Sequence, residues 1–387
     1  MSDLAAHYSR FRVGERLLLT GHSHQAWPDA GFEGQQRAWL DAAMLVDGKW
    51  AAAEAQAEQV RHGFGRLLGD DPARLALGVN THELVTRWLS ALPLRQRPRL
   101  VTTDGEFHTI RRQLARLADE GLPVEMVAAR PAATLSPRLA AAVDDRTAGV
   151  LVSSVLYDTA ECVPDLQVVA EACERHGAAL LVDAYHHLNV RPFDITAQGL
   201  GRAFVTGGGY KYCQLGEGNA FLRVPPDADL RPVLTGWFAE FADLERAGPH
   251  RVAYGPGAAA FGGATYDPTS HYRAAAVFAF HEREQLTVER LHAINRRQIQ
   301  LLSAGVEALD LDPAVASIEP MPHERRGGFL ALRIPHATAV VPALRERGVF
   351  VDARGDVLRM GPAPYLRDDQ LRDAVAALGD VLKPNRT

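Results

Sequence analysis

The stretch GAALLVDAYHHLNVRPFDITAQGLGRAFVTGGGYKYCQLGEG, residues 177–218, decides the fold of this chain. Two short apolar runs inside it, 178–182 and 203–205, predict two buried strands. Asp183 follows the first run, and Lys211 follows the second after three glycines that we expect to let the backbone turn tightly. Ligands of open α/β sheets bind outside the carboxyl ends of the strands, so Asp183 and Lys211 should face one crevice.

A carboxylate and a lysine arranged in this way suit the chemistry of pyridoxal 5'-phosphate (PLP). Lys211 would form the Schiff base, and Asp183 would keep the pyridine nitrogen protonated so that the ring accepts electrons. Tyr210, beside the lysine, is a candidate proton carrier. Taken singly, Asp183 could be a turn cap and Lys211 a surface lysine, so the prediction rests on their joint placement.

Predicted strands alternate with predicted helices along most of the chain. Gly69 and Gly177 are placed to end two helices, and Pro164 is placed in the first turn of the second one. The alternation predicts an α/β fold with a mostly parallel sheet covered by helices on both faces. We expect an N-terminal segment (1–50) that contributes to the active site and the small lobe, a large PLP-binding domain (51–255) and a small α+β C-terminal domain (256–387).

The composition excludes several classes of protein. With 387 residues and 47% hydrophobic content, the chain can bury one large core and a smaller one. A net charge of -5 and a pI near 6.3 leave no basic stripe for nucleic acid. The N-terminal region resembles neither a signal peptide nor a membrane span, so we expect a cytoplasmic protein with no membrane partner. Three cysteines without CxxC spacing predict neither a disulfide framework nor a metal site.

Three further stretches carry candidate site residues. Thr81 and His82 begin a predicted helix after a short strand, where unpaired N–H groups could bind the cofactor phosphate; Thr81 could also be a plain N-cap. Phe107, in the loop after another strand, could stack on the pyridine ring or simply pack in the core. His22 and His24 would share a face of an extended segment and could bind a metal or a substrate carboxylate, or be two polar loop histidines.

The order of motifs resembles that of kynureninases, in the class V aminotransferase group of fold type I PLP enzymes. The resemblance covers nearly the whole chain and is most specific in GGGYKYCQLGEGNAF, around Lys211, and VLRMGPAPYL, around Arg359. VNTHELVTRWLSAL, GEFHT, VDAYHHLNV and LTGWF resemble other family motifs, and GHSHQAWPD and DGKW match loosely. The resemblance implies the fold type I architecture, with a mostly parallel seven-stranded sheet in the large domain. It also implies PLP as cofactor and a homodimer with the active site at the subunit interface.

The resemblance also implies a role for each candidate residue. Lys211 would hold PLP and move the Cα proton, and Asp183 would pair with the pyridinium. Arg359 would clamp the α-carboxylate of an amino-acid substrate as a bidentate fork. His186 and Phe107 are also expected against the cofactor. The residues expected at its phosphate are Thr81, His82, Tyr210 and Trp237, of which Trp237 would come from the partner subunit. The other residues expected near the substrate are His22, His24 and Asp267.

The implied reaction is hydrolytic cleavage of the Cβ–Cγ bond of kynurenine, 3-hydroxykynurenine or a related γ-keto amino acid. The products would be an anthranilic acid and alanine, as in tryptophan catabolism. Three features depart from the family pattern. Ile110 replaces an acidic residue, and the histidine-rich GHSHQ replaces a Gly-Asn-Ser-Leu-Gly signature. Asp267 replaces an asparagine, which favours a cationic or protonated substrate. The alternatives are a class V aminotransferase, a lyase or cysteine desulfurase, an epimerase, or a PLP-binding regulator without turnover. A desulfurase would need a mobile cysteine in the C-terminal part, and none follows Cys213.

Overall fold

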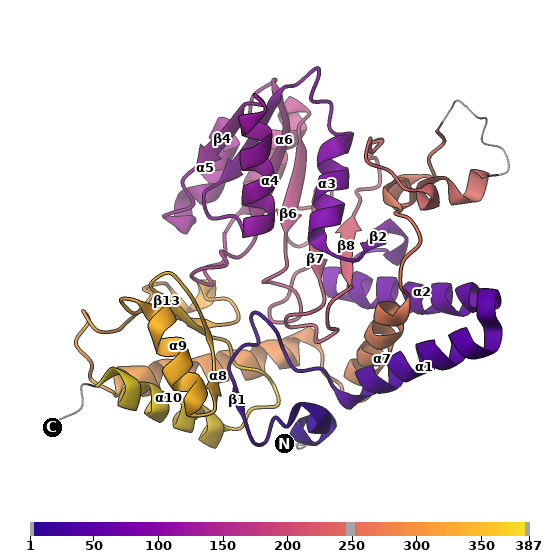
Figure 1. Ribbon diagram of the computed structural model, residues 1–387. Coiled ribbons are helices and arrows are strands. Elements are labelled where there is room, and N and C mark those ends of the chain that lie inside the picture. Colours follow the sequence, from indigo (N-terminus) through magenta and orange to yellow (C-terminus); the bar gives the residue numbers. More distant parts are fainter. Residues whose placement is uncertain (1–3, 245–251, 384–387) are drawn as a thin grey trace.

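The computed structural model describes residues 4–244 and 252–383, and a seven-stranded sheet forms the centre of its large lobe (Figure 1). The strand order is β2-β8-β7-β6-β5-β3-β4. The strands are β2 (Leu75–Gly78), β3 (Arg99–Thr103), β4 (Val124–Val127), β5 (Thr147–Ser153), β6 (Ala179–Asp183), β7 (Phe204–Gly208) and β8 (Ala220–Arg223). Strand β8 is antiparallel to both of its neighbours, and the other pairs are parallel. The expected α/β fold with a mostly parallel sheet is confirmed.

Alternate side chains of the central strands enter two separate cores. Val150 and Val152 of β5 pack in one cluster, whereas Leu151 between them packs in the other. The Leu151 side is covered by α3 (Thr81–Ala91) and α4 (His108–Asp119). The opposite side is covered by α2 (Lys49–Leu68), α5 (Leu135–Ala142), α6 (Leu166–His176) and α7 (Thr269–Arg283). Because helices cover both faces, β5 is buried along its whole length.

Two predicted helix ends, at Gly69 and Gly177, are confirmed, whereas the predicted start of a helix at Pro164 is wrong. Gly69 and Gly177 follow the last residues of α2 and α6 in the left-handed conformation, with φ of +61° and +64°. Pro164 was expected in the first turn of α6, but the helix begins at Leu166 after Asp165, so the proline precedes it. Among the described residues, no helix is both long and apolar enough to cross a membrane.

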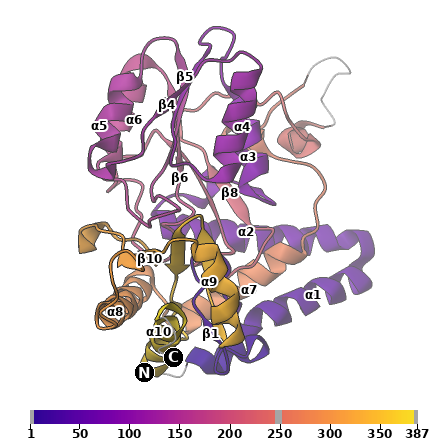
Figure 2. The same ribbon diagram turned by 60° about the vertical axis from the view of Figure 1, so that its left-hand side comes forward.

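The N-terminal segment contains a helix that the sequence pattern did not indicate. Helix α1 (Asp29–Leu45) runs back along α2 as a helical hairpin, and both pack on α7 (Figure 2). Strand β1 (Leu17–Leu18) pairs in parallel with β11 (Val349–Phe350) of the small lobe. The segment therefore contacts both lobes, and the division of the chain at residues 50 and 255 stays a proposal.

The small lobe is built on a four-stranded antiparallel sheet in the order β12-β13-β10-β9. Its elements are β9 (Ser317–Ile318), β10 (Leu330–Arg333), β12 (Asp352–Arg354) and β13 (Val357–Met360), with α8 (Val288–Glu307), α9 (Ala337–Glu346) and α10 (Asp368–Leu382). Strands β12 and β13 form a hairpin, and its register places Asp352 directly opposite Arg359. This pairing brings two charged residues to the edge of the lobe that faces the large sheet.

A buried ion pair fixes the edge of the large sheet. Arg223 of β8 is 1% exposed and donates from Nε to Asp70 Oδ2 at 2.6 Å. We expect Asp70→Ala to lower the free energy of unfolding by about 3–5 kcal/mol, because it leaves a buried guanidinium without its counter-charge. Urea unfolding followed by circular dichroism measures the loss.

The control removes an ion pair on the surface. The Arg12 and Glu15 side chains pair on the surface and are 66% and 61% exposed, so Glu15→Gln should leave the urea midpoint almost unchanged. If both variants lose the same free energy of unfolding, the burial of the Asp70–Arg223 pair does not make it more stabilising than a surface pair.

Candidate functional site

The candidate site is a cavity at the carboxyl ends of β5, β6 and β7. Ten residues line it: Thr81, Phe107, Ser153, Val155, Tyr157, Asp183, Tyr185, His186, Tyr210 and Lys211. Six of the ten are residues that the sequence singled out, namely Thr81, Phe107, Asp183, His186, Tyr210 and Lys211. Asp183 ends β6, and Lys211 follows the neighbouring strand β7 in the loop after Gly208. Parallel pairing of these two strands places the carboxylate and the amine in one cavity.

The amine of Lys211 is enclosed by rings and by one imidazole. The residue is 5% exposed, and Nζ lies 2.8 Å from His186 Nε2. Nζ also lies 4.5 Å from the ring centre of Tyr185 and 5.3 Å from that of Phe107. Burial lowers the pKa of Lys211 from 10.5 to about 7, although the carboxylate of Asp183 opposes this shift. A large fraction of the amine is therefore neutral at pH 7 and can act as a nucleophile or a base.

Asp183 provides a carboxylate at the floor of the cavity. Its Oδ1 accepts a hydrogen bond from the backbone N–H of Tyr185 at 2.9 Å. Burial raises the pKa of Asp183, while that hydrogen bond and the charge of Lys211 act in the other direction. A cationic partner, such as a protonated pyridine nitrogen, would restore the ordinary acidity of this carboxyl.

The three glycines before Tyr210 have a different purpose from the expected one. None of them has a positive φ, so they do not make a turn that only glycine can adopt. Instead there is no room for a side chain: a Cβ on Gly207 would lie 2.6 Å from Leu188 Cδ1, and one on Gly209 would lie 2.6 Å from Leu215 Cβ. The glycines allow the strand end and the Lys211 loop to pack closely against their neighbours.

A buried acid that the sequence analysis missed supports the loop of Phe107. Glu106 is 1% exposed and accepts hydrogen bonds from the hydroxyls of Ser153 at 2.6 Å and Thr103 at 2.8 Å. Burial raises the pKa of Glu106 to about 7, and the nearby charge of Asp183 adds to this effect. These bonds tie the loop to the end of β5 and hold Phe107 at the cavity wall. The signal in the sequence was an acidic residue directly before the aromatic one.

Arg359 is almost fully buried beside the cavity and is already paired. Its Nε and Nη2 donate to the two carboxylate oxygens of Asp352, and Nη1 donates to the backbone oxygen of Tyr157 at 2.7 Å. Asp352 also bonds His22 Nε2 at 2.8 Å. Sequence reasoning missed Asp352. Pairing the strands outward from the two-residue turn Gly355-Asp356 would have placed it opposite Arg359.

The two histidines of the N-terminal loop do not share a face, which contradicts the sequence expectation. Residues 21–23 form a turn, and the backbone N–H of His24 donates to Thr20 O at 2.8 Å. His22 is fully buried against Asp352, whereas His24 is exposed and stacks on Tyr210 with ring centres 5.2 Å apart. The pair therefore cannot act as one metal or carboxylate site.

Four other predicted residues lie at the border of the cavity or outside it. Thr81 lines the cavity as the first residue of α3, but the N-cap of that helix is Asn80, whose side chain accepts from Glu83 N. His82, the next residue, is exposed and does not line the cavity. Asp267 is exposed, and its carboxylate accepts from Thr269. Trp237 is 44% exposed and packs on Phe238 and Phe241, outside the cavity of its own chain.

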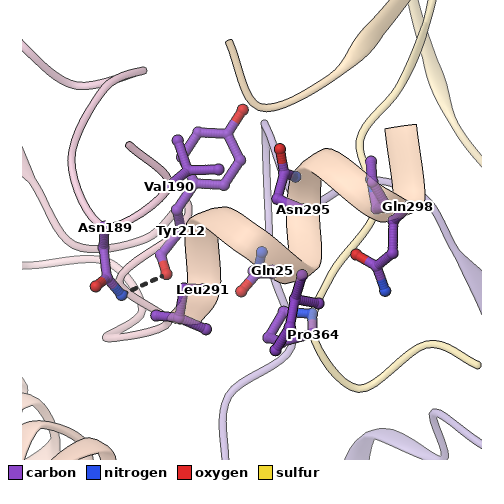
Figure 3. Close-up of a pocket in the computed structure, with 10 residues that line it drawn as sticks. Gln25, Asn189, Val190, Tyr212, Leu291, Asn295, Gln298 and Pro364 are labelled. Carbon is purple, nitrogen blue, oxygen red and sulfur yellow. Dashed lines mark hydrogen bonds between the residues drawn. The ribbon is translucent and has the colours of Figure 1, made fainter. Parts of the chain in front are cut away.

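A smaller cavity of about 10 Å³ lies between the lobes behind Tyr212 (Figure 3). Gln25, Asn189, Asn295 and Gln298 line it with amide groups, and Asn189 Nδ2 donates to Tyr212 O at 3.0 Å. The Lys211 cavity measures about 20 Å³ in the same way, so the difference lies in the lining, which holds no lysine, carboxylate or histidine here. It therefore belongs to the packing of the lobes around the Lys211 loop.

The cysteines and Ile110 serve the core. Cys162, Cys173 and Cys213 are all buried, and burial raises the pKa of each thiol, that of Cys162 to about 11. A thiolate nucleophile is disfavoured at each of these positions. Ile110 is 1% exposed and packs with the α3 and α4 side chains.

The residues of the cavity fit PLP. Lys211 offers a buried amine, and among the described residues the carboxylate of Asp183 accepts one hydrogen bond, so it keeps lone pairs for a pyridinium. His186 lines the cavity with Nε2 toward Lys211, and its buried Nδ1 has no partner among the described residues. At Thr81, the N-terminus of α3 offers N–H groups to a phosphate. The aldehyde, the pyridine nitrogen and the phosphate of the cofactor would thus each have a group of matching chemistry.

The low pKa of Lys211 predicts a pH-dependent stability. Between pH 7 and 10.5 the unfolded chain binds a proton at this lysine that the folded chain does not, so the wild type gains stability as pH rises. In the cofactor-free protein, Lys211→Met should therefore be more stable than the wild type near pH 7, and the difference should shrink toward pH 10. Thermal unfolding across this range measures it. Lys383→Met, which replaces an exposed lysine, is the control and should show no such trend. If the stability difference between Lys211→Met and the wild type does not change with pH, the lowered pKa of Lys211 is refuted.

Comparisons with known proteins show which family the chain resembles. Residues 291–378, which include Arg359, match the family model "Kynureninase C-terminal domain". A kynureninase from Pseudomonas fluorescens is 30% identical over 298 residues, covering 73% of this chain and 67% of the relative. An uncharacterized aminotransferase, YcbU, from Bacillus subtilis is 24% identical over 339 residues, covering 87% of both chains.

The fold has solved relatives as well. The cystine C–S lyase C-DES, in a mutant with glycine covalently linked to its PLP cofactor, superposes with a TM-score of 0.84 at 17% identity. The match covers 97% of this chain and 98% of that chain. At this identity the likeness concerns the fold, whereas the kynureninase of Pseudomonas fluorescens shows the family. The chain belongs to the kynureninase-like family of class V enzymes, which have fold type I and use PLP as their cofactor.

Proposed function

We propose that the protein is a PLP-dependent hydrolase that cleaves the Cβ–Cγ bond of kynurenine, 3-hydroxykynurenine or a related γ-keto amino acid. The observation that carries the proposal is the buried Lys211 amine in one cavity with Asp183, in a chain that is 30% identical to a kynureninase. The products would be an anthranilic acid and alanine. The proposal includes the cytoplasm as the place of action and tryptophan catabolism as the pathway.

The residues divide the work by their chemistry. When bound, PLP supplies an electron sink for negative charge at the substrate Cα. Lys211, with a pKa of about 7, is suited to take the proton from Cα and to return it, and His186 at 2.8 Å orients its amine. Tyr210 is the candidate proton carrier beside it, and Arg359 is the candidate partner of the α-carboxylate. Water then adds to the γ-carbonyl of the substrate, the Cβ–Cγ bond breaks, the acyl group leaves as a carboxylic acid, and Cβ takes a proton to give alanine.

The second candidate is a class V aminotransferase or a related lyase or epimerase. It is favoured by the Bacillus subtilis aminotransferase, which matches a larger share of this chain, 87% against 73%, although at lower identity. A cysteine desulfurase is the weakest variant, because all three cysteines are buried in the core. The two main candidates differ in their products, an anthranilate for the hydrolase and a keto acid for the aminotransferase.

Turnover assays separate these candidates. The PLP-loaded wild type should release anthranilate and alanine from kynurenine, or 3-hydroxyanthranilate and alanine from 3-hydroxykynurenine, as measured by liquid chromatography. Lys211→Ala should lose at least 1000-fold in turnover and should no longer be labelled with PLP by borohydride, since it lacks the amine that bonds the cofactor. Lys383→Ala is the matched control and should behave as the wild type. Keto acid formation without anthranilate would favour the aminotransferase.

We further propose that a second copy of the chain completes the site. Helix α1 exposes Trp39 and Met44, which are 79% and 78% exposed. A second aromatic group follows, in which Tyr266 lies 5.8 Å from Trp50 and 6.1 Å from Phe238. The segment Trp237–Asp243 beyond it carries Trp237, which does not reach the cavity of its own chain. A partner subunit that covers this surface would bury the apolar side chains and could bring Trp237 to the other cavity.

Light scattering coupled to size-exclusion chromatography tests the assembly. We expect a dimer for the wild type and a monomer for the double variant Trp39→Glu with Met44→Glu, because two buried charges would oppose the interface. Met126→Glu, at an exposed methionine of the edge strand β4, is the control and should remain dimeric. A monomeric wild type, or dimers in all three proteins, would overturn the proposed interface.

A further inference from the structure

Arg359 is held on one edge by a carboxylate of its own chain. It has five N–H groups, of which Nε and one on Nη2 bond Asp352, and one on Nη1 bonds Tyr157 O. The two remaining N–H groups, one each on Nη1 and Nη2, have no hydrogen-bond partner among the described residues. Asp352 occupies the edge made by Nε and Nη2, so the outer edge, made by Nη1 and Nη2, is the one that we expect to meet a second carboxylate without displacing Asp352.

The backbone and a buried histidine fix Asp352 in turn. Asp352 is the residue opposite Arg359 in the β12–β13 hairpin, so the register holds the two side chains on one face. His22 is 0% exposed, and its Nε2 lies 2.8 Å from Asp352 Oδ1. Burial lowers the pKa of His22 to about 4, so the ring is neutral, and the proton must be on Nε2 because the carboxylate only accepts.

The packing leaves this group of three side chains little freedom. The His22 ring lies 4.6 Å from the Phe329 ring, and the Arg359 guanidinium lies 5.5 Å from the same ring. Gly361 is the neighbour of His22 on the other side, and a Cβ at that position would collide with His22 Nδ1. His22 comes from the N-terminal loop, and Asp352 and Arg359 come from two strands of the small lobe. The three side chains therefore meet only when the chain is folded.

We propose that Asp352 and His22 are positioning residues, which hold Arg359 so that its outer edge receives the α-carboxylate of the amino-acid substrate. The inference rests on the proposed function only in assuming an amino-acid substrate, and it applies to the hydrolase and the aminotransferase alike. Asp352 also balances the charge of Arg359 while no substrate is bound, which lowers the cost of burying the guanidinium.

The test measures carboxylate binding apart from turnover. The probe is 3-benzoylpropionate, a γ-keto acid that has no amine and cannot bond to PLP, titrated into the PLP-loaded protein by calorimetry. Its uncharged amide, 3-benzoylpropionamide, is the matched ligand. Asp352→Asn should weaken binding of the acid by about tenfold or more, the usual cost of losing a charge-assisted hydrogen bond, and should leave binding of the amide unchanged. With an active substrate, the same variant should raise KM more than it lowers kcat.

Two further variants distinguish positioning from general stability. Glu319→Gln breaks another two-point arginine–carboxylate pair on the same sheet, with Arg333, and should bind the acid as the wild type does. His22→Leu should weaken acid binding, whereas His22→Gln, which keeps an N–H donor, should restore most of it. Wild-type binding in His22→Leu would overturn the part assigned to His22.

The result that would overturn the proposal is specific. If Asp352 competes with the substrate for Arg359, Asp352→Asn will bind the acid more tightly than the wild type; unchanged binding would equally refute a positioning role. If the wild type binds the acid but does not turn over kynurenine, the proposed hydrolase activity is wrong. The positioning role of Asp352 is then still decided by the binding measurements.

Discussion

The structure depends on one constraint, the enclosure of the Lys211 amine where water cannot stabilise its charge. An ammonium group loses hydration there, and this loss brings its pKa to about 7. The enclosure is made by the rings of Phe107, Tyr185 and Tyr210 and by the imidazole of His186. A lysine in water would be protonated and inert at neutral pH. The same lysine in this cavity can bond an aldehyde or take a proton.

The parallel sheet makes this enclosure possible. Strands β6 and β7 are neighbours and end at the same edge, so Asp183 and the Lys211 loop meet without any long-range adjustment. Close packing of the glycines at 207–209 then lets the loop lie against Leu188 and Leu215. Glu106 performs a similar task on the other side, because it ties the Phe107 loop to the end of β5. The chemistry of the site is thus supported by groups that do not themselves touch a substrate.

The N-terminal segment connects the Lys211 loop to the small lobe. Tyr8 donates to Gln214 Oε1 at 2.7 Å, and Gln214 donates to Gln25 Oε1 in the loop that also carries His22. All three polar side chains are buried, so breaking this chain of hydrogen bonds would leave groups without partners. The segment therefore connects the lysine of one lobe to the arginine of the other. It joins neither the seven-stranded nor the four-stranded sheet, since β1 pairs with β11 in a separate two-stranded one.

The sequence by itself predicted the mostly parallel sheet and the residues that the structure brings together in the Lys211 cavity, because these follow from local patterns. Apolar runs that end in Asp183 and before Lys211 need only the rule that parallel strands share an edge, and Gly69 and Gly177 need only the geometry of a helix end. The start of α6 was missed because Pro164 fits several positions before a helix.

The tertiary structure decided what lies against Arg359: Asp352 through a hairpin register, and His22 from more than 300 residues away. It also separated His22 from His24, because a turn sends one side chain into the core and leaves the other in water. Such pairings depend on how the lobes pack against each other. Local sequence patterns do not show that packing, because the contacting residues are far apart in the chain.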